Sequence, residues 1–139
     1  MLPKYKRLNR QEAISAWLEQ LRAPESLKAK GHLEDIVNPN RRCCLGHACH
    51  ALEMERGSEI PGSYGIEVSF LPTEICKLLG INRMGEFRKP LHFQDSGLVD
   101  SLAELNDCTS LKPNHIADVI EEELSKDNFI PFQEGYIET

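Results

Sequence analysis

The ten residues at positions 41–50, RRCCLGHACH, constrain the fold more than any other stretch of the chain. If a helix begins at Cys43 and turns 100° per residue, four side chains lie on one side of it and form an apolar face. They are Leu45, Ala48, Cys49 and, just after the stretch, Leu52. Gly46 falls inside this helix, where glycine costs about 1 kcal/mol relative to alanine. This cost predicts that another backbone segment or a ligand approaches closely at Gly46.

Apolar periodicity predicts helices elsewhere in the chain. Residues 11–22 carry one stripe of four side chains: Ile14, Trp17, Leu18 and Leu21. Asn9 and Glu12 have the spacing of a capping box at its start. Periodicity and start and stop signals predict the other helices over residues 43–56, 72–79, 98–107 and 113–125.

One short segment predicts β structure. Ile66, Val68 and Phe70 alternate with polar residues, which is the period of a half-exposed strand in a small hairpin. Residues 30–37 are predicted to form a short strand or an extended turn, and residues 82–96 a long connection. The predicted fold class is therefore α+β and mainly α, with about five helices packed round a small β-hairpin or short sheet.

The length of 139 residues fits a single globular domain over residues 1–139. We expect residues 1–9 to form a basic N-terminal arm and residues 127–139 a C-terminal tail that packs on the domain. No apolar run has the length of a membrane span, and the N-terminus lacks the features of a secretion signal, so we expect a cytoplasmic protein. In that compartment, five cysteines are expected to be free thiols, ligands or catalytic groups.

The net charge of −6 argues against nucleic-acid binding. A helix-turn-helix would use residues 113–125 for recognition, but this segment carries four carboxylates that would repel phosphates: Asp118, Glu121, Glu122 and Glu123. The sequence carries no signal for an oligomeric state.

A zinc site is one hypothesis for residues 41–50. In the helical projection, Cys43, His47 and His50 point away from the apolar face, and either neighbouring pair could chelate one zinc ion. Cys43 and His50 are about 10 Å apart along the helix axis, which is too far for all three to share one ion. Because a CxxC pair is also absent, we assign no metal site and expect no cofactor.

A cysteine nucleophile is the second hypothesis. Cys43 and Cys44 fall at the predicted helix start, directly after Arg41 and Arg42, where amide groups and cations favour a thiolate. The catalytic candidates are therefore Cys43 or Cys44 as nucleophile, His92 or His115 as base, and Asn106 or Asp107 as the orienting group. The alternative is a pair of cysteines that only pack in the interior.

Three ordered segments resemble a family of small uncharacterised bacteriophage and prophage proteins. They are CCLGHAC at 43–49, LPTEICKLLGI at 71–81 and LAELNDCTSLKPNHIADVIEEEL at 102–124. The resemblance implies a phage origin and a bacterial cytoplasm, and it implies no activity. The matching positions include Cys43, Cys44, Gly46 and the pair Asn106-Asp107. His47 and His50 depart from the pattern, which counts against a role built on the two histidines.

The pair Asn106-Asp107 has two interpretations. It could cap the helix that ends there and turn the chain. Alternatively, it could lie beside the start of the cysteine helix and line a polar pocket. The candidate binding residues are accordingly Arg41, Arg42, Gly46, Asn106 and Asp107.

The expected function is that of a small phage-type accessory protein. We expect a binding module that modulates a host process, through a host protein or a small signalling ligand, and possible roles include counter-defence. A cysteine-dependent hydrolase or transferase and a zinc-stabilised interaction module are the alternatives.

Overall fold

Five helices and four short strands make up the computed structural model, which describes residues 4–133. In chain order they are α1 (Arg10–Arg22), β1 (Leu27–Lys28), β2 (Arg41–Arg42), α2 (Cys44–Ala51), α3 (Thr73–Leu79), β3 (Glu86–Phe93), β4 (Gly97–Ser101), α4 (Leu102–Cys108) and α5 (Pro113–Ser125). β1 and β2 pair in parallel, and β3 and β4 form an antiparallel hairpin. The predicted class, α+β and mainly α, is confirmed.

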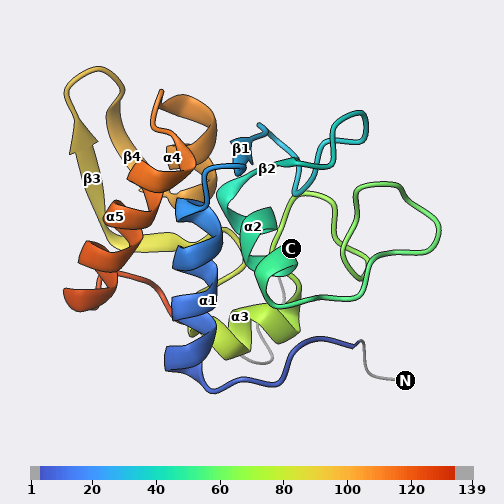
Figure 1. The fold of residues 1–139 in the computed structure, drawn as a ribbon. Coiled ribbons are helices and arrows are strands. Elements are labelled where there is room, and N and C mark those ends of the chain that lie inside the picture. Colours follow the sequence, from blue (N-terminus) through green and yellow to red (C-terminus); the bar gives the residue numbers. More distant parts are fainter. Residues whose placement is uncertain (1–3, 134–139) are drawn as a thin grey trace.

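The core is built round α1. This helix packs against α2, α3 and α5, and α5 runs beside it in the opposite direction (Figure 1). Trp17 of α1 is fully buried, and its indole N–H donates to the carbonyl of Cys44 at 2.8 Å. One hydrophobic cluster collects side chains from all five helices. Replacing a buried tryptophan of this kind by alanine typically costs about 3–5 kcal/mol, so α1 organises the interior.

The predicted helix-start signals of α1 and α5 are confirmed. Asn9 accepts a hydrogen bond from the amide of Glu12 at 2.8 Å, and Glu12 accepts one from the amide of Asn9 at 3.1 Å, which completes the capping box. Pro113 begins α5, where its missing N–H costs no hydrogen bond. Local sequence therefore determines where these two helices begin.

The helix α2 is shorter than predicted. It ends at Ala51 because Glu53 adopts a left-handed conformation with φ of 52°. The amide of Met54 donates to the carbonyl of Cys49 at 2.9 Å, and the amide of Glu53 donates to the carbonyl of His50 at 3.1 Å. These two bonds form a Schellman motif. The prediction placed the end near Gly57 because glycine, not glutamate, is the usual residue at such a turn.

The hairpin lies in a different place from the predicted strand. Residues 66–70 form a turn and bends with one isolated bridge, between Glu67 and Tyr64, and Ile66 is 89% exposed. The predicted connection over residues 82–96 instead contains β3. The pairing of β3 with β4 is irregular between Glu86 and Leu91, and Pro90 falls within this interval. Proline is tolerated at such irregularities, although it argues against a regular strand. The prediction of a connection over residues 82–96 was wrong because this segment pairs with β4 in spite of its proline.

The fourth helix begins later than predicted. Leu98 belongs to β4 and is 64% exposed, whereas α4 starts at Leu102 after the hydroxyl of Ser101 caps the amide of Glu104 at 3.1 Å. Residues 30–37 form an extended turn with one bridge, between Glu34 and Arg42.

Both ends of the described chain contact the rest of the fold. The amide of Lys6 donates to the carbonyl of Leu52 at 2.7 Å, and the rings of Phe87 and Phe129 lie 5.1 Å apart. The predicted tail is described only as far as residue 133, so residues 134–139 lie outside the described part. Within residues 4–133, no helix has both the length and the apolar character that a membrane span needs.

Candidate functional site

The start of α2 places both candidate thiols in the interior. Cys43 and Cys44 are 6% and 1% exposed. The sulfur of Cys43 accepts a hydrogen bond from the amide of Gly46 at 3.3 Å and so caps α2, while the thiol of Cys44 donates to the carbonyl of Leu102 at 3.5 Å. The predicted position at a helix start is correct, but both side chains are part of the core.

Burial opposes thiolate formation at both positions. It raises the pKa of the Cys43 thiol to about 11 and that of Cys44 well above its ordinary value. The hydrogen bond from Gly46 lowers the pKa of Cys43, but this effect is smaller than that of burial. The prediction of a readily formed thiolate was wrong because desolvation outweighs the helix N-terminus.

The candidate bases lie apart from these thiols. His92 is exposed on β3, and His115 is exposed in the first turn of α5. An exposed imidazole does not reach a sulfur that is enclosed by the core. The structure therefore offers no support for a cysteine nucleophile with either histidine.

Asn106 and Asp107 connect α4 to the start of α2. The side-chain oxygen of Asn106 accepts from the amide of Cys44 at 3.0 Å, and its amide group donates to the carbonyl of Ala29 at 2.7 Å. The carboxylate of Asp107 accepts from the amide of Gly31 at 3.1 Å and from Asn106 at 2.9 Å. The pair lies beside the cysteine helix, as one interpretation proposed, and the side chain of the buried Asn106 binds the backbone of residues 29 and 44.

At Gly46, the backbone of α2 contacts the backbone of Leu33. A Cβ atom at this position would lie 1.7 Å from the carbonyl oxygen of Leu33. The prediction of a close approach is confirmed, and the group that approaches is the backbone of residue 33. Through this contact, the extended turn over residues 30–37 packs directly against α2.

His47 is buried, contrary to the helical projection. Its Nε2 lies 2.9 Å from the carbonyl oxygen of Leu27, and its Nδ1 lies 3.5 Å from the side-chain amide nitrogen of Gln20. Both ring nitrogens therefore have partners inside the protein. Only His50 of the two histidines faces solvent. Among residues 4–133, no three side chains of His, Cys, Asp or Glu are grouped so that they could hold a metal ion. The zinc hypothesis therefore gains no support.

Stability is expected to fall between pH 7 and pH 5 because of His47. Burial lowers the pKa of His47 to about 4, below the ordinary value of 6.5. The unfolded chain therefore binds a proton in this range that the folded chain excludes, and the free energy of unfolding decreases as the pH falls. Linkage gives a loss of about 2 kcal/mol at pH 5, which urea unfolding at several pH values would measure.

A His47→Gln variant isolates this effect. Glutamine can still donate to the carbonyl of Leu27 but does not titrate, so the variant should show a smaller difference between pH 7 and pH 5. Burial also lowers the pKa of His50, which retains part of the difference. His115→Gln changes an exposed histidine and serves as the control. Parallel pH profiles for wild type and His47→Gln would contradict the assignment.

Arg42 belongs to a buried ion-pair network that the sequence did not reveal. Its Nε donates to the carboxylate of Glu34 at 3.0 Å, and Arg56 donates to the same carboxylate at 2.9 Å. The hydroxyl of Tyr64 also donates to Glu34, at 2.9 Å. Arg41, by contrast, is exposed. The partners lie up to 30 residues apart in sequence, so local spacing carries no signal for this network.

The network holds Glu34 in its charged form. Burial alone would raise the pKa of Glu34, but the hydrogen bonds from Arg56 and Tyr64 outweigh it, and the pKa lies below its ordinary value. The same burial raises the pKa of Tyr64 to about 12, so its hydroxyl stays protonated and donates. One carboxylate thus joins the extended turn over residues 30–37 to the loop over residues 54–70.

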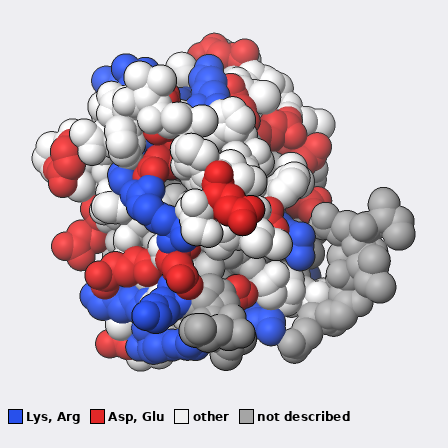
Figure 2. Space-filling view, turned by 90° about the vertical axis from the view of Figure 1, so that its right-hand side faces the viewer, with Lys and Arg blue, Asp and Glu red and all other residues white. Residues whose placement is uncertain are grey.

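These two loops expose apolar side chains to solvent. Five such side chains form what we name the loop surface: Ile36, Val37, Ile60, Ile66 and Phe70. Val37 is 92% exposed and Ile66 is 89% exposed. The loops occupy the right-hand side of Figure 1, and Figure 2 shows this side as patches of uncharged residues between groups of charged ones.

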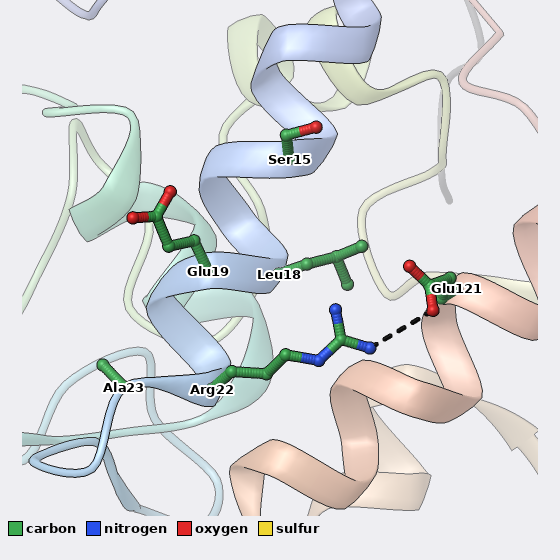
Figure 3. A pocket seen from close by; sticks show the side chains of 6 residues that line it. All are labelled: Ser15, Leu18, Glu19, Arg22, Ala23 and Glu121. Atoms are coloured by element: carbon green, nitrogen blue, oxygen red, sulfur yellow. Dashed lines mark hydrogen bonds and ion pairs between the residues drawn. The ribbon is translucent and has the colours of Figure 1, made fainter.

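A groove between α1 and α5 is a further open feature of the structure. It has a volume of about 570 Å³ and is lined by Ser15, Leu18, Glu19, Arg22, Ala23 and Glu121 (Figure 3). Arg22 donates to Asp118 at 2.8 Å and to Glu121 at 3.3 Å. These two pairs join α1 to α5 across the groove, and they already engage the guanidinium group of Arg22.

Comparison with known protein families, with curated proteins and with solved structures yields no match for this chain.

Proposed function

We propose that this chain is a small phage-type accessory protein that binds a host protein through the loop surface. It would act in the cytoplasm of a bacterial host and modulate a host process. The motif resemblance of residues 43–49, 71–81 and 102–124 supports the phage-type part of the proposal. The exposed apolar side chains of two anchored loops support the binding part, and they are the observation that carries it.

Anchored loops are suited to binding because little order must be created on association. The carboxylate of Glu34 holds Arg42, Arg56 and Tyr64 together, and the amide of Leu33 donates to the carbonyl of Val68 at 2.7 Å. Immobilising side chains and loops on binding usually costs free energy. A loop surface that is already held in place avoids part of this cost.

The shape of the loop surface favours a protein over a small ligand. Small ligands are normally enclosed in a concave site that removes most of their surface from water. Val37 and Ile66 instead project almost fully into solvent, and Ile36 is 68% exposed. Exposed apolar groups of this kind become buried when a second protein covers them.

A capture experiment with matched variants tests the proposal. Wild type, Val37→Asp and Ile66→Asp would be used to capture proteins from a bacterial lysate, and the captured protein would be identified by mass spectrometry and purified. We expect each aspartate variant to weaken binding of this purified partner by about tenfold or more, since a charge would be buried in the interface. Calorimetric titration measures the change.

Leu98→Asp is the matched control. Leu98 is an exposed leucine on β4, away from the two loops, so this variant carries the same added charge and should bind like wild type. Exposed substitutions of this kind change stability little. Equal binding by wild type, Val37→Asp and Ile66→Asp would refute the proposed surface.

A further inference from the structure

A second cavity lies at the opposite side of the molecule from the loop surface. It has a volume of about 230 Å³ and is lined by residues from the start of α1, the end of α3 and the segment after α5. Figure 1 shows these three segments close together. Its lining combines two arginines with an apolar wall: Arg10, Arg88, Asp127, Leu124, Phe129 and Pro131. We infer that this cavity binds a small ligand that carries an oxyanion, either a carboxylate or a phosphate, on an apolar body.

Arg10 is held in position by the end of α3. Its Nε donates to the carbonyl of Leu79 at 3.0 Å. Gly80, the next residue, has a left-handed conformation with φ of 75°, and a Cβ atom there would lie only 2.8 Å from this Nε. The glycine therefore leaves room for the guanidinium against the helix end. Among the described residues, no further hydrogen bond engages Arg10, so its terminal N–H groups are open to a ligand.

Arg88 is anchored in the same manner from the other wall. Its Nε donates to the backbone carbonyl of Asp127 at 3.1 Å, and its backbone amide donates to the backbone carbonyl of Asn128 at 2.8 Å. The carboxylate of Asp127 lies 4.0 Å from the Arg88 guanidinium and is 88% exposed. The lining thus contains two guanidinium groups, of Arg10 and Arg88, and one exposed carboxylate, of Asp127. It therefore has an excess of positive charge.

The chemistry of this lining selects the ligand class. A guanidinium presents parallel N–H donors that match the two oxygens of a carboxylate or phosphate. Leu124, the buried Phe129 and Pro131 provide an apolar surface beside the two cations. A ligand with an oxyanion alone would leave this surface unused. An organic acid or a phosphate ester with a small apolar group uses both parts.

Three probes test the inference: phenyl phosphate, benzoate and inorganic phosphate. Titration of the full chain, followed by NMR of the backbone amides, should show shifts at residues 79–80 and 127–129. We expect phenyl phosphate or benzoate to bind about tenfold more tightly than inorganic phosphate, because only they contact the apolar wall. The preferred probe of the two identifies the oxyanion as phosphate or carboxylate.

Variants of the two arginines complete the test. Arg10→Gln and Arg88→Gln should each weaken binding of the preferred probe by about tenfold or more. Arg22→Gln changes an arginine of the other groove and should bind like wild type. Arg88 is half exposed, so Arg88→Gln carries the test if Arg10→Gln does not fold. The inference is overturned if neither organic probe shifts these amides at about 10 mM, or if both variants bind as wild type does.

Discussion

Gly46→Ala is expected to destabilise the protein by about 3 kcal/mol or more. The added Cβ would lie 1.7 Å from the carbonyl oxygen of Leu33, and both groups belong to backbone that is packed in the core. Relief requires the turn over residues 30–37 to move away from α2. Chemical denaturation followed by circular dichroism would measure the loss.

Helix propensity makes the opposite prediction, which sharpens the experiment. Alanine is favoured over glycine by about 1 kcal/mol inside a helix, so a helix without the Leu33 contact would gain stability from Gly46→Ala. Ala51→Gly, at the last residue of the same helix, is the control and should cost about 1 kcal/mol or less. A stabilised Gly46→Ala variant would rule out the backbone contact.

Glu34→Ala is expected to cost about 3–5 kcal/mol, because it leaves a buried cation without its partner. Arg42 is 6% exposed and donates to Glu34, and Tyr64 donates to the same carboxylate. Removal of that carboxylate leaves the buried charge of Arg42 without its counter-ion, with only the hydroxyl of Tyr64, among the residues that the structure describes, as an acceptor at 3.3 Å. The free energy of unfolding, measured with urea at pH 7, tests this expectation.

Arg56→Ala is the matched control within the same network. Arg56 is 50% exposed, and without it Glu34 keeps both Arg42 and Tyr64, so we expect a clearly smaller loss than for Glu34→Ala. Glu34→Gln keeps the size of the side chain but removes its charge, and it should fall between the two. Equal losses for Glu34→Ala and Arg56→Ala would show that the buried charge of Arg42 does not dominate.

Local signals predicted the features that depend on neighbours in sequence. Asn9 and Glu12 form the capping box, and Pro113 begins α5, because capping and proline geometry act within a single turn. Gly46 was identified as a close contact for a related reason, since an unfavourable residue in a helix requires compensation. The segment that provides this compensation, at Leu33, was not predictable from local spacing.

Predictions failed where distant residues decide the environment. Cys43 and Cys44 lie at a helix start, as expected, but packing against α4 buries them and raises the pKa of both thiols. The burial of His47 was not predicted for the same reason, because its partner, the carbonyl of Leu27, lies 20 residues earlier in the sequence. β3 forms despite Pro90 because β4 pairs with it and the register accommodates an irregular interval.

The fold class, the two capped helices and the close approach on α2 could be predicted from local sequence, because each depends on periodicity or on contacts within a few residues. Which polar groups are buried and which apolar groups are exposed follows from the folded arrangement alone. Glu34 is enclosed with Arg42 while Val37, three residues further on, is left in solvent. The physical reason is that burial and ion pairing depend on segments that meet only when the chain has folded.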